Sequence, residues 1–309
     1  RRFKMGKIAF VFPGQGAQHP GMGKSLYENS SAAKALFDSA EKHMPGVCGI
    51  AFGGSEEELR QTKNTQPCLY LADLGAALAL NEAGIYADCA AGFSLGEIAA
   101  LAYGGAYSAE DGFKIVCRRG EFMQTASEAA DTMMTAVMKL SPDKVSELCA
   151  QFENVYPVNF NSQLQTVVAG ERTQTELFKE AAKEAGGRCI DLKVGAAFHS
   201  PYMNGAAEKF GAFLDGFSVC EPKIPIFGNT LAKPLSGDIK SAMARQIANP
   251  VKWTDTILNM VESGVDTFIE TGTGKTLSGL IKRIAPDAAV YSVEEYADIE
   301  NVYGSVHNA

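Results

Sequence analysis

The chain of 309 residues has little of several residue types, and each shortage argues against a class of protein. The seven cysteines are scattered, odd in number and never spaced as C-x-x-C, which argues against a disulfide framework or a zinc site. This usage fits a reducing cytosol, so we expect a cytoplasmic protein. No apolar run is long enough to span a bilayer, and no signal peptide is visible.

Basic residues are also in the minority. There are 28 Lys and Arg against 36 Asp and Glu, which gives a net charge of -8. This balance argues against binding to nucleic acid or to an anionic membrane surface, although it leaves room for a local basic pocket.

The chain does contain a regular alternation of predicted strands and helices. Residues 7–12 form a continuous apolar run, which is typical of a strand buried on both faces. Residues 133–194 have the order βαββαβ of a ferredoxin-like unit. Strands and helices alternate on both sides of this unit, which predicts a mostly parallel sheet covered by helices. We therefore expect an α/β protein with a large subdomain, residues 1–126 and 199–309, and an inserted small subdomain, residues 127–198.

The most informative motif is the run from Ala91 to Glu97, which contains Gly-x-Ser-x-Gly. Small residues precede it, as in a short buried strand, and an alanine-rich apolar stretch follows, as in a helix. Strand, tight turn and helix would place Ser94 at a sharp bend with its hydroxyl exposed, as in a nucleophile elbow. The backbone N–H of Leu95 then becomes a candidate oxyanion donor. The pattern alone also fits an ordinary N-cap serine.

A nucleophilic serine needs a general base, and the chain offers four histidines. We expect His307 in the terminal tail and His43 in a surface loop. His19 follows the first strand in a glycine-rich stretch. His199 precedes Ser-Pro, which has the form of an N-cap and a first helical position, and the positive helix end would favour a neutral imidazole. Elimination leaves His199 as the best candidate and His19 as the second, with a structural histidine as the alternative.

One arginine is predicted to lie on an apolar helix face. On a helix over residues 108–126, Arg119 shares its face with Ile115, Phe122 and Met123. A guanidinium there needs an anionic partner. From this helix alone a structural carboxylate is the favoured partner, and a substrate carboxylate held in bidentate geometry is the alternative.

Together these residues resemble the malonyl-CoA:acyl carrier protein transacylases and the acyltransferase domains of polyketide and fatty acid synthases. Seven motifs in family order carry the resemblance, which extends from end to end of the chain. They are Phe12-Pro-Gly-Gln-Gly-Ala-Gln18, Gly92-x-Ser-Leu-Gly-Glu97, Arg119-Gly-x-Phe-Met-Gln124, Pro157-Val-Asn-Phe-Asn-Ser162, Ala197-Phe-His-Ser-x-x-Met203, Arg245-Gln246 with Asn249-Pro-Val-x-Trp253, and Gly272-x-Gly-Lys275. The resemblance implies an α/β-hydrolase-like parallel-sheet core with the ferredoxin-like insertion. The full-length match favours a free-standing enzyme.

The resemblance also implies catalytic roles. Ser94 would take the acyl group, and His199 would act first as general base and then as general acid. In this family a main-chain carbonyl orients the histidine, and the matching position is Gln246. The backbone N–H groups of Gln15 and Leu95 would form the oxyanion hole.

Four further residues are implied in substrate binding. Arg119 would bind the malonyl carboxylate, Arg188 would lie near the coenzyme A phosphates, and Asn161 would line the substrate site. Phe93 departs from the family, which usually has histidine beside the nucleophile, and its ring neither donates nor accepts a hydrogen bond. Since nucleophile and base are kept, we expect activity, with Phe93 affecting the rate or the preference for malonyl.

The implied reaction transfers malonyl from malonyl-CoA to the phosphopantetheine thiol of acyl carrier protein, by a ping-pong route through acylated Ser94, in fatty acid biosynthesis. We expect no cofactor and a monomer. The alternatives are a stand-alone polyketide-synthase acyltransferase, a serine thioesterase or hydrolase, and a carrier-protein-binding module with a degraded site. Transfer to a thiol rather than to water would separate the transferase from the hydrolase, and absence of any acyl-enzyme would favour the binding module.

Overall fold

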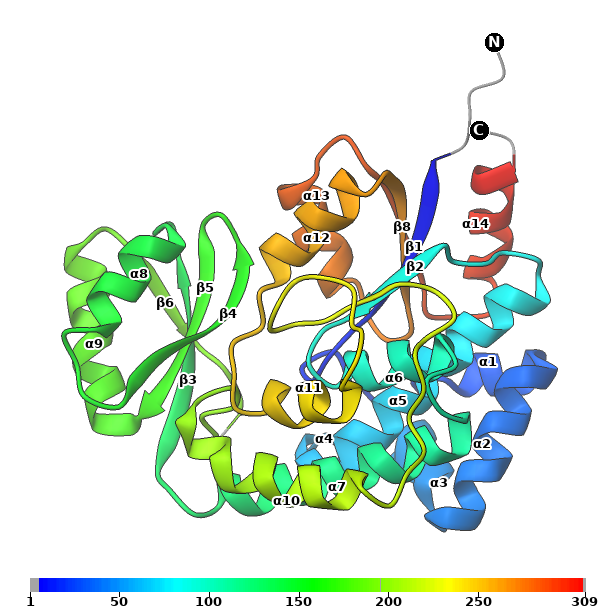
Figure 1. Ribbon diagram of the computed structural model, residues 1–309, viewed down its shortest axis with the longest axis horizontal. Helices are drawn as coiled ribbons and strands as arrows, with labels where there is room; N and C mark the ends of the chain where they lie inside the picture. Colours follow the sequence, from blue (N-terminus) through cyan, green and yellow to red (C-terminus); the bar gives the residue numbers. More distant parts are fainter. Residues whose placement is uncertain (1–5, 195, 308–309) are drawn as a thin grey trace.

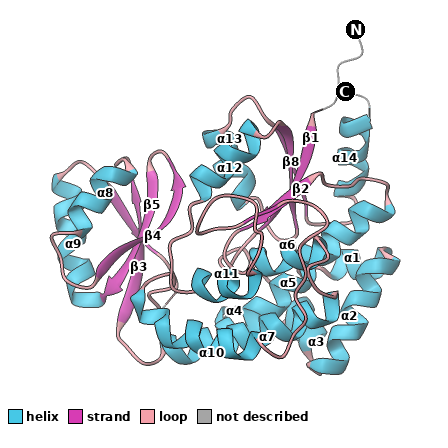
Figure 2. Cartoon of the chain, viewed as in Figure 1, coloured by secondary structure: helices cyan, strands magenta, loops and turns pink. Residues whose placement is uncertain are grey.

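The computed structural model describes residues 6–194 and 196–307, which form two sheets with helices packed against them (Figure 1, Figure 2). The larger sheet is parallel, with strand order β7-β2-β1-β8-β9. Its strands are β1 (Lys7–Phe12), β2 (Cys89–Gly92), β7 (Ile226–Phe227), β8 (Val265–Thr271) and β9 (Ala289–Val293). The expected parallel-sheet core is confirmed.

Helices cover both faces of this sheet. They are α1 (Lys24–Asn29), α2 (Ser31–His43), α3 (Val47–Gly53), α4 (Glu56–Arg60), α5 (Thr62–Glu82), α6 (Gly96–Tyr103), α7 (Ala109–Ser127), α10 (Asn204–Leu214), α11 (Ile239–Gln246), α12 (Trp253–Glu262), α13 (Thr276–Ile284) and α14 (Asp298–His307), with a 3-10 turn at Pro201–Met203. None of the helices in the described residues combines the length and the apolarity that a membrane crossing needs.

The side chains of β1 show how the sheet is buried. Phe10 and Phe12 lie in the main hydrophobic cluster together with residues of α5 and α6. Ala9 and Val11 point to the opposite face and join a second cluster with residues of α12 and α13. Figure 1 shows α12 and α13 on one side of β1 and β8, with α5 and α6 on the other. The alternation confirms the prediction that this strand is buried on both faces.

The small sheet is antiparallel, with strand order β4-β5-β3-β6. Its unit consists of β3 (Thr132–Met138), α8 (Pro142–Cys149), β4 (Val155–Ser162), β5 (Gln165–Glu171), α9 (Arg172–Glu184) and β6 (Arg188–Asp191). This chain order confirms the ferredoxin-like βαββαβ expectation. Phe178 of α9 packs with Val137 on one face, whereas Met134 and Val167 on the other face belong to the main cluster. The subdomain boundaries at residues 127 and 198 stay a prediction.

Two expectations about histidines were wrong. His43 is not in a surface loop but is the last residue of α2, and its ring lies 3.0 Å from Glu110. His307 is not in a tail, because α14 extends to it. In both cases amphipathic helical periodicity continued further than the flanking residues suggested.

Candidate active site

Ser94 lies in the tight turn between β2 and α6. Phe93, Ser94 and Leu95 alone separate the end of β2 from the start of α6. The φ angle of Ser94 is 55°, in the left-handed region that residues other than glycine rarely adopt. A Cβ atom at Gly96 would lie 2.1 Å from the carbonyl oxygen of Phe12, so only glycine fits there. The close packing of α6 on β1 thus forces the sharp bend that the motif predicts.

The hydroxyl of Ser94 faces His199. Ser94 Oγ and His199 Nε2 lie 2.7 Å apart, while Nδ1 faces the carbonyl oxygens of Gln246 at 2.9 Å and Asn249 at 3.2 Å. Because a carbonyl oxygen only accepts, the proton of the neutral ring belongs on Nδ1, and the Nε2 lone pair faces the serine. Ser94 is not a helix cap, since Leu95 occupies the N-cap position of α6 and no side chain caps that helix.

The environment of His199 favours the neutral ring. Burial, and then the positive charge of Arg119, lower the pKa of His199 to about 4. The sequence predicted a neutral imidazole from a helix end. The helical turn that follows His199 is a 3-10 turn of only three residues, Pro201–Met203. The neutral imidazole is instead favoured by burial and by the charge of Arg119.

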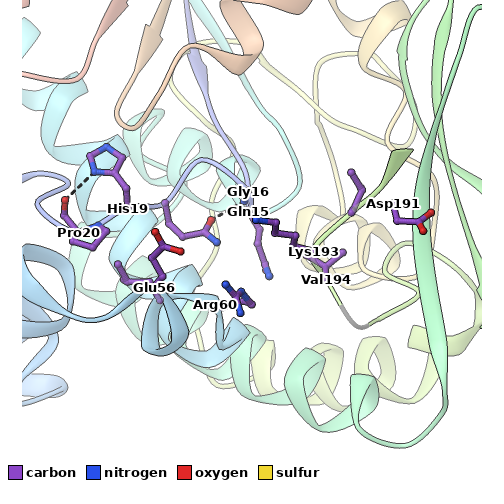
Figure 3. Close-up of a pocket in the computed structure, with 12 residues that line it drawn as sticks. Gln15, Gly16, His19, Pro20, Glu56, Arg60, Asp191, Lys193 and Val194 are labelled. Atoms are coloured by element: carbon purple, nitrogen blue, oxygen red, sulfur yellow. Dashed lines mark hydrogen bonds between the residues drawn. The ribbon is translucent and has the colours of Figure 1, made fainter. Parts of the chain in front are cut away.

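The second candidate base, His19, lies elsewhere. Its Nδ1 is 2.9 Å from the carbonyl oxygen of Pro20, and its Nε2 pairs with Glu294. The ring is exposed on the wall of a hollow that also includes Gln15 (Figure 3). The structure therefore brings His199, and not His19, to the serine.

The two predicted oxyanion donors lie in turns at the same edge of the sheet. β1 and β2 are parallel neighbours with Phe12 opposite Gly92, so the turns that contain Gln15 and Leu95 leave the sheet side by side. A Cβ at Gly14 would lie 2.5 Å from the carbonyl oxygen of Phe93, which shows how closely these turns approach. Within the described residues, neither the Gln15 N–H nor the Leu95 N–H donates a hydrogen bond. Both remain free for an oxygen of a ligand.

Arg119 is completely buried, and its hydrogen-bond partners are neutral. It donates to Gln66 Oε1 and Gln246 Oε1, each at 2.8 Å, and its Nη2 lies 3.3 Å from Ser94 Oγ. No carboxylate in the described part of the chain forms an ion pair with it. The structural carboxylate that α7 alone favoured therefore forms no direct ion pair, although the buried Glu97 is near enough for its charge to raise the pKa of Arg119. Burial lowers the pKa of Arg119 to about 10, so the group stays charged at neutral pH.

Side-chain amides that the sequence did not single out support the site. Gln246 Nε2 donates to the carbonyl oxygen of Ser94 at 2.7 Å, so this residue contacts Arg119, His199 and Ser94 at once. Asn229 Oδ1 accepts from the Ser94 N–H at 2.7 Å, and Glu97 Oε2 accepts from the Asn229 N–H at 2.6 Å. Burial raises the pKa of Glu97 to about 7. The sequence gives no sign that Asn229 contacts Ser94, because this contact depends on the pairing of β7 with β2.

The remaining predicted binding residues occupy different surroundings. Phe93 is half-buried and packs edge-to-face on Trp253, with ring centroids 5.5 Å apart. Asn161, on β4, is nearly buried, and its Oδ1 has no hydrogen-bond partner among the described residues. Arg188 is exposed on the edge strand β6, and within the described residues it makes no hydrogen bond to Ser94 or His199.

Two hollows meet at Gln15. One has a volume of about 510 Å³ and lies between the turn after β1, α4 and the residues that follow β6 (Figure 3). The other, of about 400 Å³, extends to Phe198, the neighbour of the base. Arg60 and Lys193 line both hollows. Two carboxylates also line each of them, Glu56 and Asp191 in the first and Glu57 and Glu128 in the second. Among the described residues no group of His, Cys, Asp or Glu side chains is arranged to hold a metal ion.

Comparison with known proteins agrees with this geometry. Residues 9–308 match the model of the acyl transferase domain family, and the chain belongs to this family. A malonyl CoA-acyl carrier protein transacylase of Bacillus subtilis is 38% identical over 304 residues, which cover 96% of each chain.

Solved structures are similar over the same extent. The transacylase of Clostridium perfringens superimposes with a TM-score of 0.94 at 34% identity and covers 98% of both chains. A malonyl-transacylase solved with a type II polyketide acyl carrier protein gives a TM-score of 0.93 at 32% identity, covering 98% of this chain and 100% of that one.

Proposed function

We propose that this protein transfers malonyl groups from malonyl-CoA to the phosphopantetheine thiol of acyl carrier protein and serves fatty acid biosynthesis. The observation that carries the proposal is a Ser94–His199 pair beside a buried Arg119 that has only neutral partners. A nucleophile with its base performs acyl transfer, and an unmatched guanidinium selects an acyl group that carries a carboxylate. The names of the relatives agree with both features.

In the first half-reaction, the malonyl carboxylate binds Arg119 and the thioester carbon lies at Ser94 Oγ. As Oγ attacks, His199 Nε2 takes its proton, and the Gln15 and Leu95 N–H groups bind the oxygen that becomes negative. The carbon–sulfur bond then breaks. The departing coenzyme A sulfur takes the proton from His199, and malonyl remains as an ester on Ser94.

The second half-reaction reverses these steps with a different thiol. The phosphopantetheine thiol of the carrier protein gives its proton to His199, and its sulfur attacks the ester carbon. Ser94 Oγ leaves and regains the proton from His199. The chemistry uses only side chains and backbone N–H groups of this chain, so we propose that it needs no cofactor.

We further propose how the substrates reach the site. The hollows that meet at Gln15 admit the phosphopantetheine arm, and Arg60 and Lys193, the two cations that line both, bind its phosphate. We assign the buried Oδ1 of Asn161, which has no hydrogen-bond partner among the described residues, to a pantetheine amide. We assign Arg188 to coenzyme A or carrier contacts on the outer edge of the small sheet, and we place a monomeric enzyme in the cytoplasm.

Intact-protein mass spectrometry after brief incubation with malonyl-CoA tests the function. We expect one malonyl adduct that is absent in Ser94→Ala and that is discharged when holo acyl carrier protein is added. Accumulation of free coenzyme A and malonate without an adduct would indicate a hydrolase. Absence of both adduct and turnover would indicate a carrier-binding module without activity.

A further inference from the structure

We propose that Asn229 is a positioning residue for the nucleophile. In this proposal its side-chain amide holds the backbone of the elbow in the left-handed conformation that directs Ser94 Oγ at His199. The inference rests on the proposed role of Ser94 as the acyl carrier, and it assigns a function to a residue that does not itself meet the substrate.

The sheet places Asn229 beside the elbow. β7 and β2 are parallel neighbours, with Ala91 opposite Phe227. Both strands therefore end at the same edge of the sheet, and the residue two positions after Phe227 lies level with the turn that contains Ser94. Asn229 is 1% exposed, so its polar atoms depend on protein partners.

One amide group bridges two residues of the elbow. Asn229 Oδ1 accepts from the Ser94 N–H at 2.7 Å, and Nδ2 donates to the carbonyl oxygen of Gly92 at 2.6 Å. This bridge needs one donor and one acceptor on the same short side chain, which asparagine provides and an ionised aspartate or a leucine does not.

Asn229 is itself fixed by its neighbours. Its N–H donates to Glu97 Oε2, which lies one turn beyond the nucleophile on α6. Gln246 Nε2 approaches Asn229 Oδ1 at 3.3 Å and donates to the Ser94 carbonyl oxygen at 2.7 Å. Both backbone groups of Ser94 are thus bound by side-chain amides, so the turn keeps an unfavourable φ without leaving them unsatisfied.

These contacts affect chemistry through geometry. A serine in a relaxed turn would lose the 2.7 Å contact between Oγ and His199 Nε2. The adjacent Leu95 N–H would also turn away from the site that it shares with Gln15. Loss of the bridge should therefore slow the attack of Ser94 Oγ on the thioester carbonyl. Malonyl binding at Arg119 should be retained, because Arg119 is held by hydrogen bonds to Gln66 and Gln246.

The first test compares Asn229→Ala with Asn301→Ala, a matched change at an exposed position on α14. Two rates are measured: single-turnover acylation by malonyl-CoA, and labelling by a fluorophosphonate, which reacts with an activated serine whatever acyl group the enzyme prefers. We expect N229A to slow both rates roughly 10- to 100-fold with little change in KM, and N301A to match the wild type. A folded N229A that labels at the wild-type rate would overturn the proposal.

A conservative variant adds a readout that a purely structural role would not change. In Asn229→Asp, the neutral carboxyl group both accepts and donates, whereas the ionised group only accepts and faces the Gly92 carbonyl oxygen. Glu97 from α6 and, through Gln246, Arg119 are the ionisable groups packed around it. The labelling rate of N229D relative to the wild type should therefore rise as the pH falls, and a flat ratio would contradict the proposal.

The two variants also separate this inference from the proposed function. If N229A is unfolded at the assay temperature, the pH dependence of N229D decides the question alone. A wild-type protein that reacts with the fluorophosphonate but not with malonyl-CoA would refute the proposed function, and the labelling test of Asn229 would still stand.

Discussion

At the residue scale, we propose that Arg119 determines which acyl group the site prefers. Its guanidinium is buried, charged and hydrogen-bonded only to neutral groups among the described residues, so a carboxylate on the substrate would be its first direct ion-pair partner. We predict that Arg119→Ala lowers malonyl transfer roughly 10- to 100-fold more than acetyl transfer, the value of a charge-assisted hydrogen bond. Parallel acylation assays with malonyl-CoA and acetyl-CoA measure this difference. Equal losses for both substrates would show that Arg119 only supports the fold.

Arg119 also acts on the base. Its positive charge is one of the two causes that lower the pKa of His199 to about 4, and burial is the larger. Protonation removes the base, so we predict that fluorophosphonate labelling of the wild type falls only as the pH approaches 4. In Arg119→Ala the imidazolium form of His199 becomes less unfavourable, so the pKa of His199 rises. The fall in labelling at acid pH should therefore occur at a higher pH than in the wild type. If labelling fell at the same pH in both proteins, this effect of Arg119 on His199 would be contradicted.

At the scale of elements, the strand–turn–helix unit of β2 and α6 depends on glycine. A Cβ at Gly96 would lie 2.1 Å from the carbonyl oxygen of Phe12, whereas a Cβ at Gly279 on the exposed face of α13 meets nothing within 4 Å. We predict that Gly96→Ala destabilises the protein by about 3 kcal/mol and abolishes serine labelling. Gly279→Ala should add up to about 1 kcal/mol of stability and leave labelling unchanged. Thermal unfolding with labelling measures both, and a stable, reactive G96A would show that the turn tolerates widening.

The same elements show what the sequence reveals and what it hides. The continuous apolar run at residues 7–12 and the helix over residues 108–126 correspond closely to β1 and α7, because burial on both faces and a capping serine, Ser108, are local signals. In another helix, Pro67 favours a start at that residue, but α5 begins at Thr62 and includes the proline. Pro67 is the sixth residue of the helix, inside it, where a proline lacks the N–H that would bond to the preceding turn, so it does not mark the boundary.

The site divides in a similar way. Ser94, His199 and Arg119 were found because each has a motif or a helix face of its own. Asn229 and Gln66 were missed because their importance comes from contacts between distant segments, which no periodicity records. The neutral partners of Arg119 likewise follow from tertiary packing and not from α7, on which a structural carboxylate was the better expectation.

At the scale of the whole molecule, the small sheet is hydrogen-bonded to the segment whose carbonyl oxygens face His199. The Val251 N–H donates to the Val158 carbonyl oxygen at 2.8 Å, and the Phe160 N–H donates to the Val251 carbonyl oxygen at 2.9 Å. These bonds join β4 to the stretch between α11 and α12. The carbonyl oxygens of Gln246, the last residue of α11, and of Asn249, in this stretch, face His199. The small sheet therefore contributes to the catalytic geometry although neither Ser94 nor His199 lies on it.

This connection predicts the hydrogen-exchange behaviour of the segment from Ile247 to Trp253. A connecting segment normally exchanges quickly, but one held by the edge of a sheet opens only when the sheet opens. We predict that the amides of Val251 and Phe160 exchange as slowly as those of β5, the neighbour of β4 in the sheet. Hydrogen–deuterium exchange resolved to single amides measures this. Rapid exchange at Val251 beside a protected β5 would mean that the segment moves independently, so that His199 is oriented by the large sheet and its helices alone.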